Sequence, residues 1–110
     1  MMRIAMSKAA SALFRALLAR GEVSRDRILL THYRSTDWQS LTFIGERHRL
    51  GFRIPAPEAG AVGLSITDGI EDAEFTIPGH IVADIEVVCP PAQEDDGSVT
   101  FELEALTIAE

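Results

Sequence analysis

The sequence has little of several residue types that mark specialised proteins. Cys89 is the only cysteine, so an intrachain disulfide is excluded and nothing points to an oxidising compartment. No apolar stretch reaches the roughly 18 to 20 residues needed to cross a bilayer, so we expect no transmembrane segment and a cytoplasmic location. Glycine-rich phosphate loops and nucleophile-elbow motifs are also missing. Nucleotide binding therefore has no positive signal, and we predict no cofactor.

Lysine and arginine are absent from the second half of the chain. All ten basic residues lie within residues 1–53, whereas residues 54–110 contain thirteen of the seventeen acidic residues. The formal net charge of −7 argues against nonspecific binding to nucleic acid or to anionic membranes, since both require accumulated positive charge. We expect the two halves of the chain to attract each other.

The length of 110 residues predicts a single domain spanning residues 1–110, and 46% apolar residues can supply its core. Residues 1–21 contain Arg3, Lys8, Arg15 and Arg20 but no acidic residue. Transit peptides and membrane-surface helices share this composition. We interpret the segment as part of the fold and keep a targeting role as the less favoured alternative.

The first segment has the spacing of an amphipathic helix. Apolar side chains recur every three to four residues, at Ala10, Leu13, Phe14, Leu17 and Leu18. Ser7 is suited to cap the amino end of this helix, and Gly21 is suited to the left-handed position after its carboxyl end. Arg20 would complement the negative end of the helix dipole.

Short segments with the alternation of β-strands follow. The sequence predicts strands at 28–33, 41–43, 48–54, 62–66, 70–77, 81–87 and 99–105, with turns at 45–48, 68–69 and 78–79 and polar connections at 34–39 and 90–98. A helix followed by strands favours an α+β fold, in which the helix packs on a mainly antiparallel sheet of about six or seven short strands. The alternatives are a small barrel or a two-sheet β-sandwich with one helix.

Four carboxylates form the most suggestive group in the sequence. Asp84 and Glu86 alternate with apolar residues in one predicted strand, and Glu102 and Glu104 do so in another. A register that pairs Ile85 with Leu103 matches the buried faces, and it places Asp84 opposite Glu104 and Glu86 opposite Glu102. Opposed like charges are unfavourable unless something intervenes.

Three interpretations account for these carboxylates. A divalent cation such as calcium prefers clustered oxygen ligands, although the sequence has no glycine-containing calcium loop. Paired carboxylates also serve in acid–base catalysis, where one raises the pKa of the other. We favour the third interpretation, in which Arg47, Arg49 and Arg53 lie on the polar face of another strand and pair with the acids.

The remaining reactive side chains lack partners at a recognised spacing. His32, His48 and His80 are scattered, and Cys89 ends an apolar run, where it is expected to pack as a small core residue. His48 falls on the apolar side of its predicted strand. We interpret it as a half-buried structural imidazole, with a pocket acid or base as the alternative. Trp38 is either a core anchor or an exposed interface residue in the 34–39 connection.

The separated charge favours a noncatalytic interaction or assembly domain that self-associates into a homo-oligomer through complementary charged surfaces. The alternative is a small enzyme or ligand-binding domain with a pocket between helix and sheet that uses His48, Glu102 or Glu104. The sequence does not identify a small-molecule ligand, and no motif identifies a family.

Overall fold

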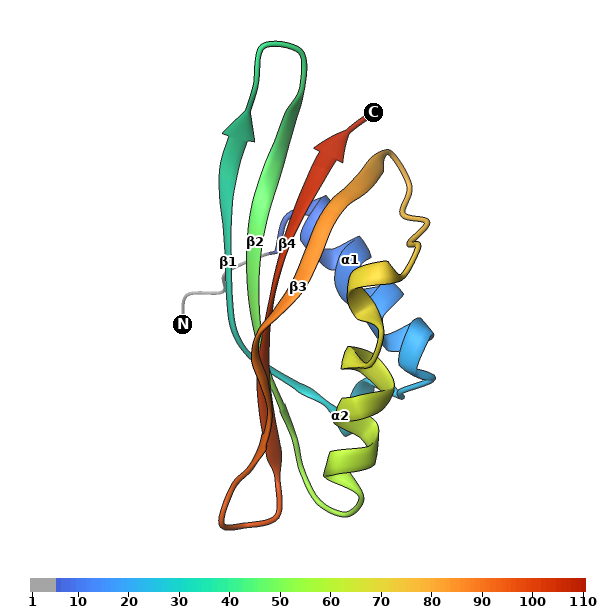
Figure 1. Cartoon of the computed structure of the whole chain (residues 1–110), viewed down its shortest axis with the longest axis vertical. Helices are drawn as coiled ribbons and strands as arrows, with labels where there is room; N and C mark the ends of the chain where they lie inside the picture. Colours follow the sequence, from blue (N-terminus) through green and yellow to red (C-terminus); the bar gives the residue numbers. More distant parts are fainter. Residues whose placement is uncertain (1–5) are drawn as a thin grey trace.

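A computed structural model describes residues 6–110 and shows an α+β fold (Figure 1). The elements follow the order α1 (Lys8–Gly21), β1 (Leu29–Gln39), β2 (Ile44–Ile54), α2 (Ala59–Thr67), β3 (His80–Gln93) and β4 (Val99–Ala109), with short 3-10 turns at Arg25–Arg27 and Ile70–Asp72. The strands form one open antiparallel sheet in the order β1-β2-β4-β3. The predicted class is confirmed, but the expected six or seven strands are wrong: the sheet has four longer strands and is accompanied by two α-helices.

Helix α1 is built as its apolar spacing predicts. Ser7 caps it by accepting a hydrogen bond from the backbone N–H of Ala10 at 3.1 Å. The expected end at Gly21 is wrong by one position, because Gly21 is still helical and Glu22 adopts the left-handed conformation with φ 53°. Gly21 instead allows the close approach of α2, since an added Cβ would lie 2.8 Å from Cγ1 of Ile66. A larger residue would push the helices apart.

The core lies between α1, α2 and one face of the sheet. Leu13 and Leu17 of α1 are fully buried with Leu50 of β2 and Leu103 of β4. The ring of Phe52 stands between those of Phe14 and Phe101, with centroid distances of 5.7 and 5.1 Å. The predicted buried side of residues 99–105 is confirmed, as Val99, Phe101, Leu103 and Ala105 all face this core.

The first two strands form one long hairpin, which corrects two predictions. The polar residues 34–39 belong to β1 rather than to a connection, and the turn lies at residues 40–43 rather than at 45–48. The turn is held by hydrogen bonds from Ser40 N to Phe43 O and from Phe43 N to Ser40 Oγ. Gly45 continues β2 because its backbone lies against β4: an added Cβ would be 2.0 Å from the carbonyl oxygen of Thr107.

The hairpin predicted at residues 62–77 is wrong, because α2 and a 3-10 turn occupy this segment. The apolar run from Ala61 to Ile66 is short enough to suit either a strand or a helix. As a helix it buries Ile66, and it presents Gly63 to Val99, where an added Cβ would be 3.4 Å from Cγ1 of Val99. Packing against the sheet therefore decides its conformation.

Strands β3 and β4 were predicted, but β3 is longer and less regular than expected. It continues through Pro90 and Pro91 to Gln93, with register shifts after Val82, Val87 and Cys89.

Neither helix of residues 6–110 is long and apolar enough to span a membrane.

Candidate functional site

The sheet face opposite the helices is the candidate site. Alternating residues of β2 point to opposite sides, so His48, Leu50 and Phe52 are buried beneath the helices while Arg47 and Arg49 are exposed on the other side. We call this second side the open face. Its side chains come from His32, Arg34, Thr36 and Trp38 of β1, Gly45, Arg47, Arg49, Gly51 and Arg53 of β2, Thr100, Glu102, Glu104, Leu106 and Ile108 of β4, and Ile81, Asp84, Glu86 and Cys89 of β3.

The register arranges the open face in rows across the four strands. One row, here the charged row, runs from Arg34 through Arg49 and Glu104 to Glu86, so two positive side chains are followed by two negative ones. Arg34, Arg49 and Glu86 are exposed, and Glu104 is half-buried. The charges are thus sorted by strand, with the positive pair on β1 and β2 and the negative pair on β4 and β3.

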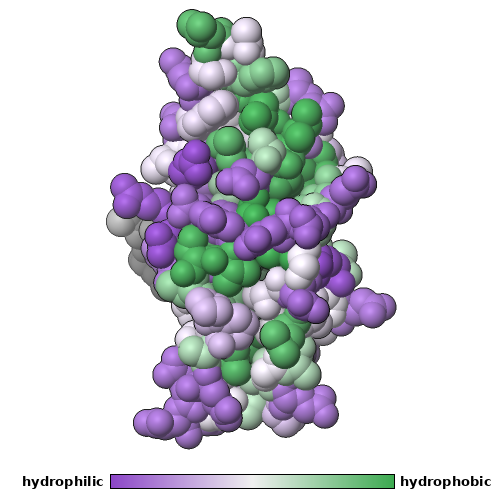
Figure 2. Space-filling view, viewed as in Figure 1, coloured by the Kyte–Doolittle hydropathy of each residue, from purple (hydrophilic) through white to green (hydrophobic). Residues whose placement is uncertain are grey.

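A second row is apolar and lies nearer the β1–β2 turn. The apolar row consists of Trp38, Gly45, Ile108 and Ile81 in neighbouring positions. Ile81 is 52% exposed, and Trp38 and Ile108 are half-buried. Figure 2 shows hydrophobic surface towards the hairpin end of the molecule and a hydrophilic band across its middle. The open face therefore combines an apolar end with a charged centre.

Ion pairs join the two halves of the open face where β2 meets β4. Arg49 Nε lies 3.3 Å from Glu102 Oε1, Arg49 Nη1 lies 3.8 Å from Glu104 Oε2, and Arg47 Nη1 lies 3.6 Å from Glu104 Oε1. The predicted pairing of Arg47 and Arg49 with the acids is confirmed for Glu102 and Glu104 of β4, but neither arginine pairs with Asp84 or Glu86 of β3. Arg53 pairs instead with Asp96 in the β3–β4 turn. Exposed pairs of this kind contribute about 0 to 1 kcal/mol each.

The outer charges of the open face remain without an ion pair in the described part of the chain. Arg34 on β1 and Asp84 and Glu86 on β3 are all exposed, and none forms a salt bridge within residues 6–110. Three inter-strand spacings separate β1 from β3, about 14 Å, so these side chains are too far apart to neutralise one another directly.

The predicted register of the four carboxylates is wrong. Ile85 pairs with Ala105 rather than with Leu103, so Glu86 is opposite Glu104 and Asp84 is opposite Leu106. The two registers differ by two residues, and such a shift leaves the same sides of both strands buried, so alternation does not distinguish them. Within residues 6–110 no group of three or more histidine, cysteine or acidic side chains is arranged to hold a metal ion.

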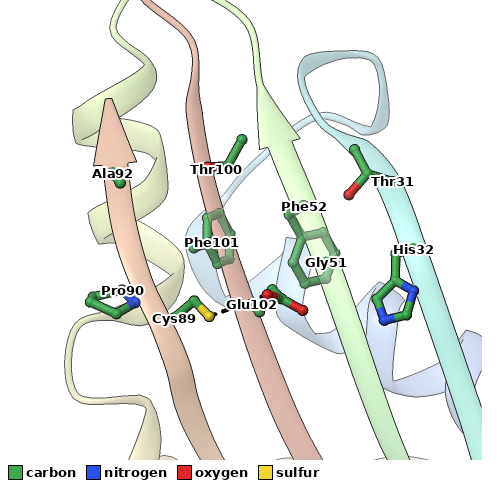
Figure 3. Close-up of a pocket in the computed structure, with 10 residues that line it drawn as sticks. All are labelled: Thr31, His32, Gly51, Phe52, Cys89, Pro90, Ala92, Thr100, Phe101 and Glu102. Carbon is green, nitrogen blue, oxygen red and sulfur yellow. Dashed lines mark hydrogen bonds between the residues drawn. The ribbon is translucent and has the colours of Figure 1, made fainter. Parts of the chain in front are cut away.

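A hollow of about 360 Å³ lies on the open face beside the charged row (Figure 3). His32 and Cys89 come from opposite edges of the sheet, and Glu102 lies between them beside Gly51. Cys89 Sγ donates a hydrogen bond to Glu102 Oε2 at 3.2 Å. Cys89 lies on the open face, not in the core as expected.

The surroundings of Cys89 favour its protonated thiol form. Its hydrogen bond to the Glu102 carboxylate raises the pKa of the thiol, which favours the protonated form. The same hydrogen bond, with the guanidinium of Arg49, lowers the pKa of Glu102, so this carboxyl is held as an anion. His32 is too distant across the sheet to accept the thiol proton. The hollow therefore lacks an activated nucleophile and a carboxylic acid with a raised pKa.

His48 lies on the other side of the sheet and is fully buried. Its Nδ1 is 2.7 Å from Ser35 Oγ and its Nε2 is 2.8 Å from Thr107 Oγ1, so both ring nitrogens have hydroxyl partners. Burial lowers the pKa of His48, which favours the neutral ring. Because His48 faces the helices while Glu102 and Glu104 face the open side, the structure does not bring these three candidates together in one pocket.

The sequence did not identify Arg34, Ile81 and Ile108 as residues of the open face, and it predicted Trp38 in a loop. Arg34 and Trp38 were missed because strand β1 lacks the alternation of apolar and polar residues by which a strand is recognised. The alternation of Ile81, Ala83 and Ile85 also hid the bulge at residue 83, which turns Ile81 to the open face.

Comparisons with protein-family models, with curated proteins and with solved structures found no match to this chain. The interpretation of the site therefore depends on its own geometry.

Proposed function

We propose that this chain is a noncatalytic assembly domain that self-associates through the open face of its sheet. In this proposal the basic half of the face, on β1 and β2, contacts the acidic half, on β4 and β3, of a second copy. The observation that supports it most directly is the charged row, whose outer members Arg34 and Glu86 have no ion-pair partner in residues 6–110.

The charge arrangement favours a second copy over an unrelated partner. One face carries both signs in separate halves, so two identical faces are complementary when one is turned relative to the other. A partner with one charge sign would be attracted by one half and repelled by the other. Charged side chains in separate halves also reduce indiscriminate stacking, because like halves repel.

The proposal includes no reaction and no cofactor. The thiol of Cys89 is held protonated, and the ionisable groups nearest to it are an anionic carboxylate and an arginine that is already paired. A cytoplasmic location belongs to this proposal as well, since a free thiol on the interface suits a reducing compartment.

Light scattering at two salt concentrations tests the proposal. At low ionic strength and a protein concentration on the order of 100 μM, which exceeds the Kd of a micromolar complex, we expect a mass of twice 12.0 kDa. At about 1 M salt, where the Debye length falls to about 3 Å, the expected mass moves towards that of the monomer. A monomer at both salt concentrations would overturn the proposal.

A further inference from the structure

The apolar row suggests how the second copy is oriented. Two stacked sheets that share a face are related by a two-fold axis lying in the plane between them. If the axis runs along the strands, β1 of one copy lies over β3 of the other and each row faces the same row of its partner. If it runs across the strands, β1 lies over β1, and basic halves face each other.

We infer that the two-fold axis runs along the strands, so that Trp38 of each copy packs on Ile81 and Ile108 of the other; this inference rests on the proposed self-association. In this arrangement Arg34 also lies over Glu86 of the second copy. One orientation therefore sets opposite charges together in the charged row and apolar side chains together in the apolar row. The rotation across the strands sets Arg34 and Arg49 near the basic half of the other copy, so it makes the charged rows repel each other.

Steric detail around Trp38 supports the same contact. Trp38 pairs across the hairpin with Gly45, which has no side chain to cover the indole. A half-buried tryptophan in the same row as an exposed isoleucine suits the centre of an interface, where large aromatic side chains contribute most.

The orientation also places both β1–β2 turns at the same end of the dimer. Leu41 is fully exposed in the turn, and Phe43 and Ile44 are each more than half exposed. The two turns would then extend the apolar end beyond the stacked sheets, rather than lying at opposite ends of the assembly.

The first arm of the test removes the apolar contact. We expect Trp38→Ala to raise the Kd for self-association about 10- to 100-fold, in the range of interface hot spots. Leu64→Ala is the matched control, since Leu64 is 58% exposed on α2, away from the open face. Circular dichroism and urea unfolding of both variants show whether the fold is retained. Equal Kd values for folded Trp38→Ala and wild-type protein would overturn the contact.

The second arm measures the orientation with the native thiol. Position 32 on β1 and Cys89 on β3 share a row, so in the inferred dimer His32→Cys places a thiol over Cys89 of the second copy at a sheet separation of about 10 Å. A short bismaleimide should then yield covalent dimers. Wild-type protein, with Cys89 alone, and His32→Cys in a Cys89→Ser background should not, because equivalent positions of the two copies lie further apart.

The outcomes separate this inference from the proposed function. Covalent dimers from only the two-thiol protein support the inferred axis. Salt-sensitive dimers in light scattering that are not cross-linked through positions 32 and 89 would overturn the orientation and leave self-association standing. A monomer under all conditions would remove both.

Discussion

At the scale of single residues, His48 shows how a buried polar group is made compatible with a core. The imidazole has hydroxyl partners on both nitrogens, from Ser35 of β1 and Thr107 of β4, so it links three strands beneath the helices. Burial lowers its pKa, and His80 acts in the same direction, while Glu46 opposes them. The neutral ring is therefore the form that the fold accommodates.

This burial predicts a pH dependence of stability. The pKa of His48 in the folded protein is below its unfolded value of about 6.5. The contribution of the neutral ring to the free energy of unfolding is therefore fully present above about pH 6.5 and is lost as the pH falls below it. The slope is at most about 1.4 kcal/mol per pH unit. We expect the free energy of unfolding in urea to fall between pH 7 and pH 5 for the wild-type protein. His48→Gln should show a smaller decline over this range. Parallel curves for the two proteins would contradict the account.

At the scale of elements, Arg20 lies at the carboxyl end of α1, as the sequence predicts, and also joins α1 to α2. Its guanidinium donates hydrogen bonds to the carbonyl oxygens of Ser65, Ile66 and Asp68 at the end of α2. It thus complements the negative end of α2, which has no basic residue of its own in its last turn.

Removal of this side chain should weaken the attachment of α2. We expect Arg20→Ala to lower the free energy of unfolding by about 1 to 2 kcal/mol, because three carbonyl groups lose a charged donor. Arg15→Ala, an exposed position of the same helix, is the control and should change stability by less than about 0.5 kcal/mol. Equal stabilities of the two variants would show that the capping contact contributes nothing.

Helix α1 and strand β4 could be predicted because an unbroken apolar period runs through each. Helix α2 could not, since the few apolar residues from Ala61 to Ile66 fit both periods and contacts with Val99 and Ile54 decide between them. The predicted strand ends at residue 33, whereas β1 continues to Gln39. It is an edge strand with exposed residues on both faces, so its second half has no apolar alternation. The predicted and observed registers of β3 and β4 differ by two residues, a shift that alternation alone does not reveal because the same sides stay buried.

At the scale of the whole molecule, the strand order turns the basic and acidic halves of the sequence into basic and acidic halves of the open face. The order β1-β2-β4-β3 keeps each hairpin intact, so the strands of the basic first half lie together and those of the acidic second half lie beside them. Ion pairs of Arg47 and Arg49 with Glu102 and Glu104 form at the boundary. The expected attraction between the halves thus occurs within the chain, and the outer charges are the ones that we propose to pair with a second copy.

The central claim is that opposite halves of two open faces meet, and a charge-exchange experiment with Arg34 and Glu86 tests it most directly. Arg34→Glu gives a face with acidic residues at both positions, and Glu86→Arg gives one with basic residues at both. Each variant alone should be a monomer, because the two-fold axis doubles every repulsion. Arg15→Glu, with the same charge change on α1, should still self-associate.

Sedimentation equilibrium of an equimolar mixture of Arg34→Glu and Glu86→Arg, at low salt, is the decisive measurement. The account predicts a one-to-one complex with twice the 12.0 kDa monomer mass, formed from two proteins that do not associate alone. Dimers of either variant by itself, or a mixture that remains monomeric while the wild-type protein dimerises, would contradict it.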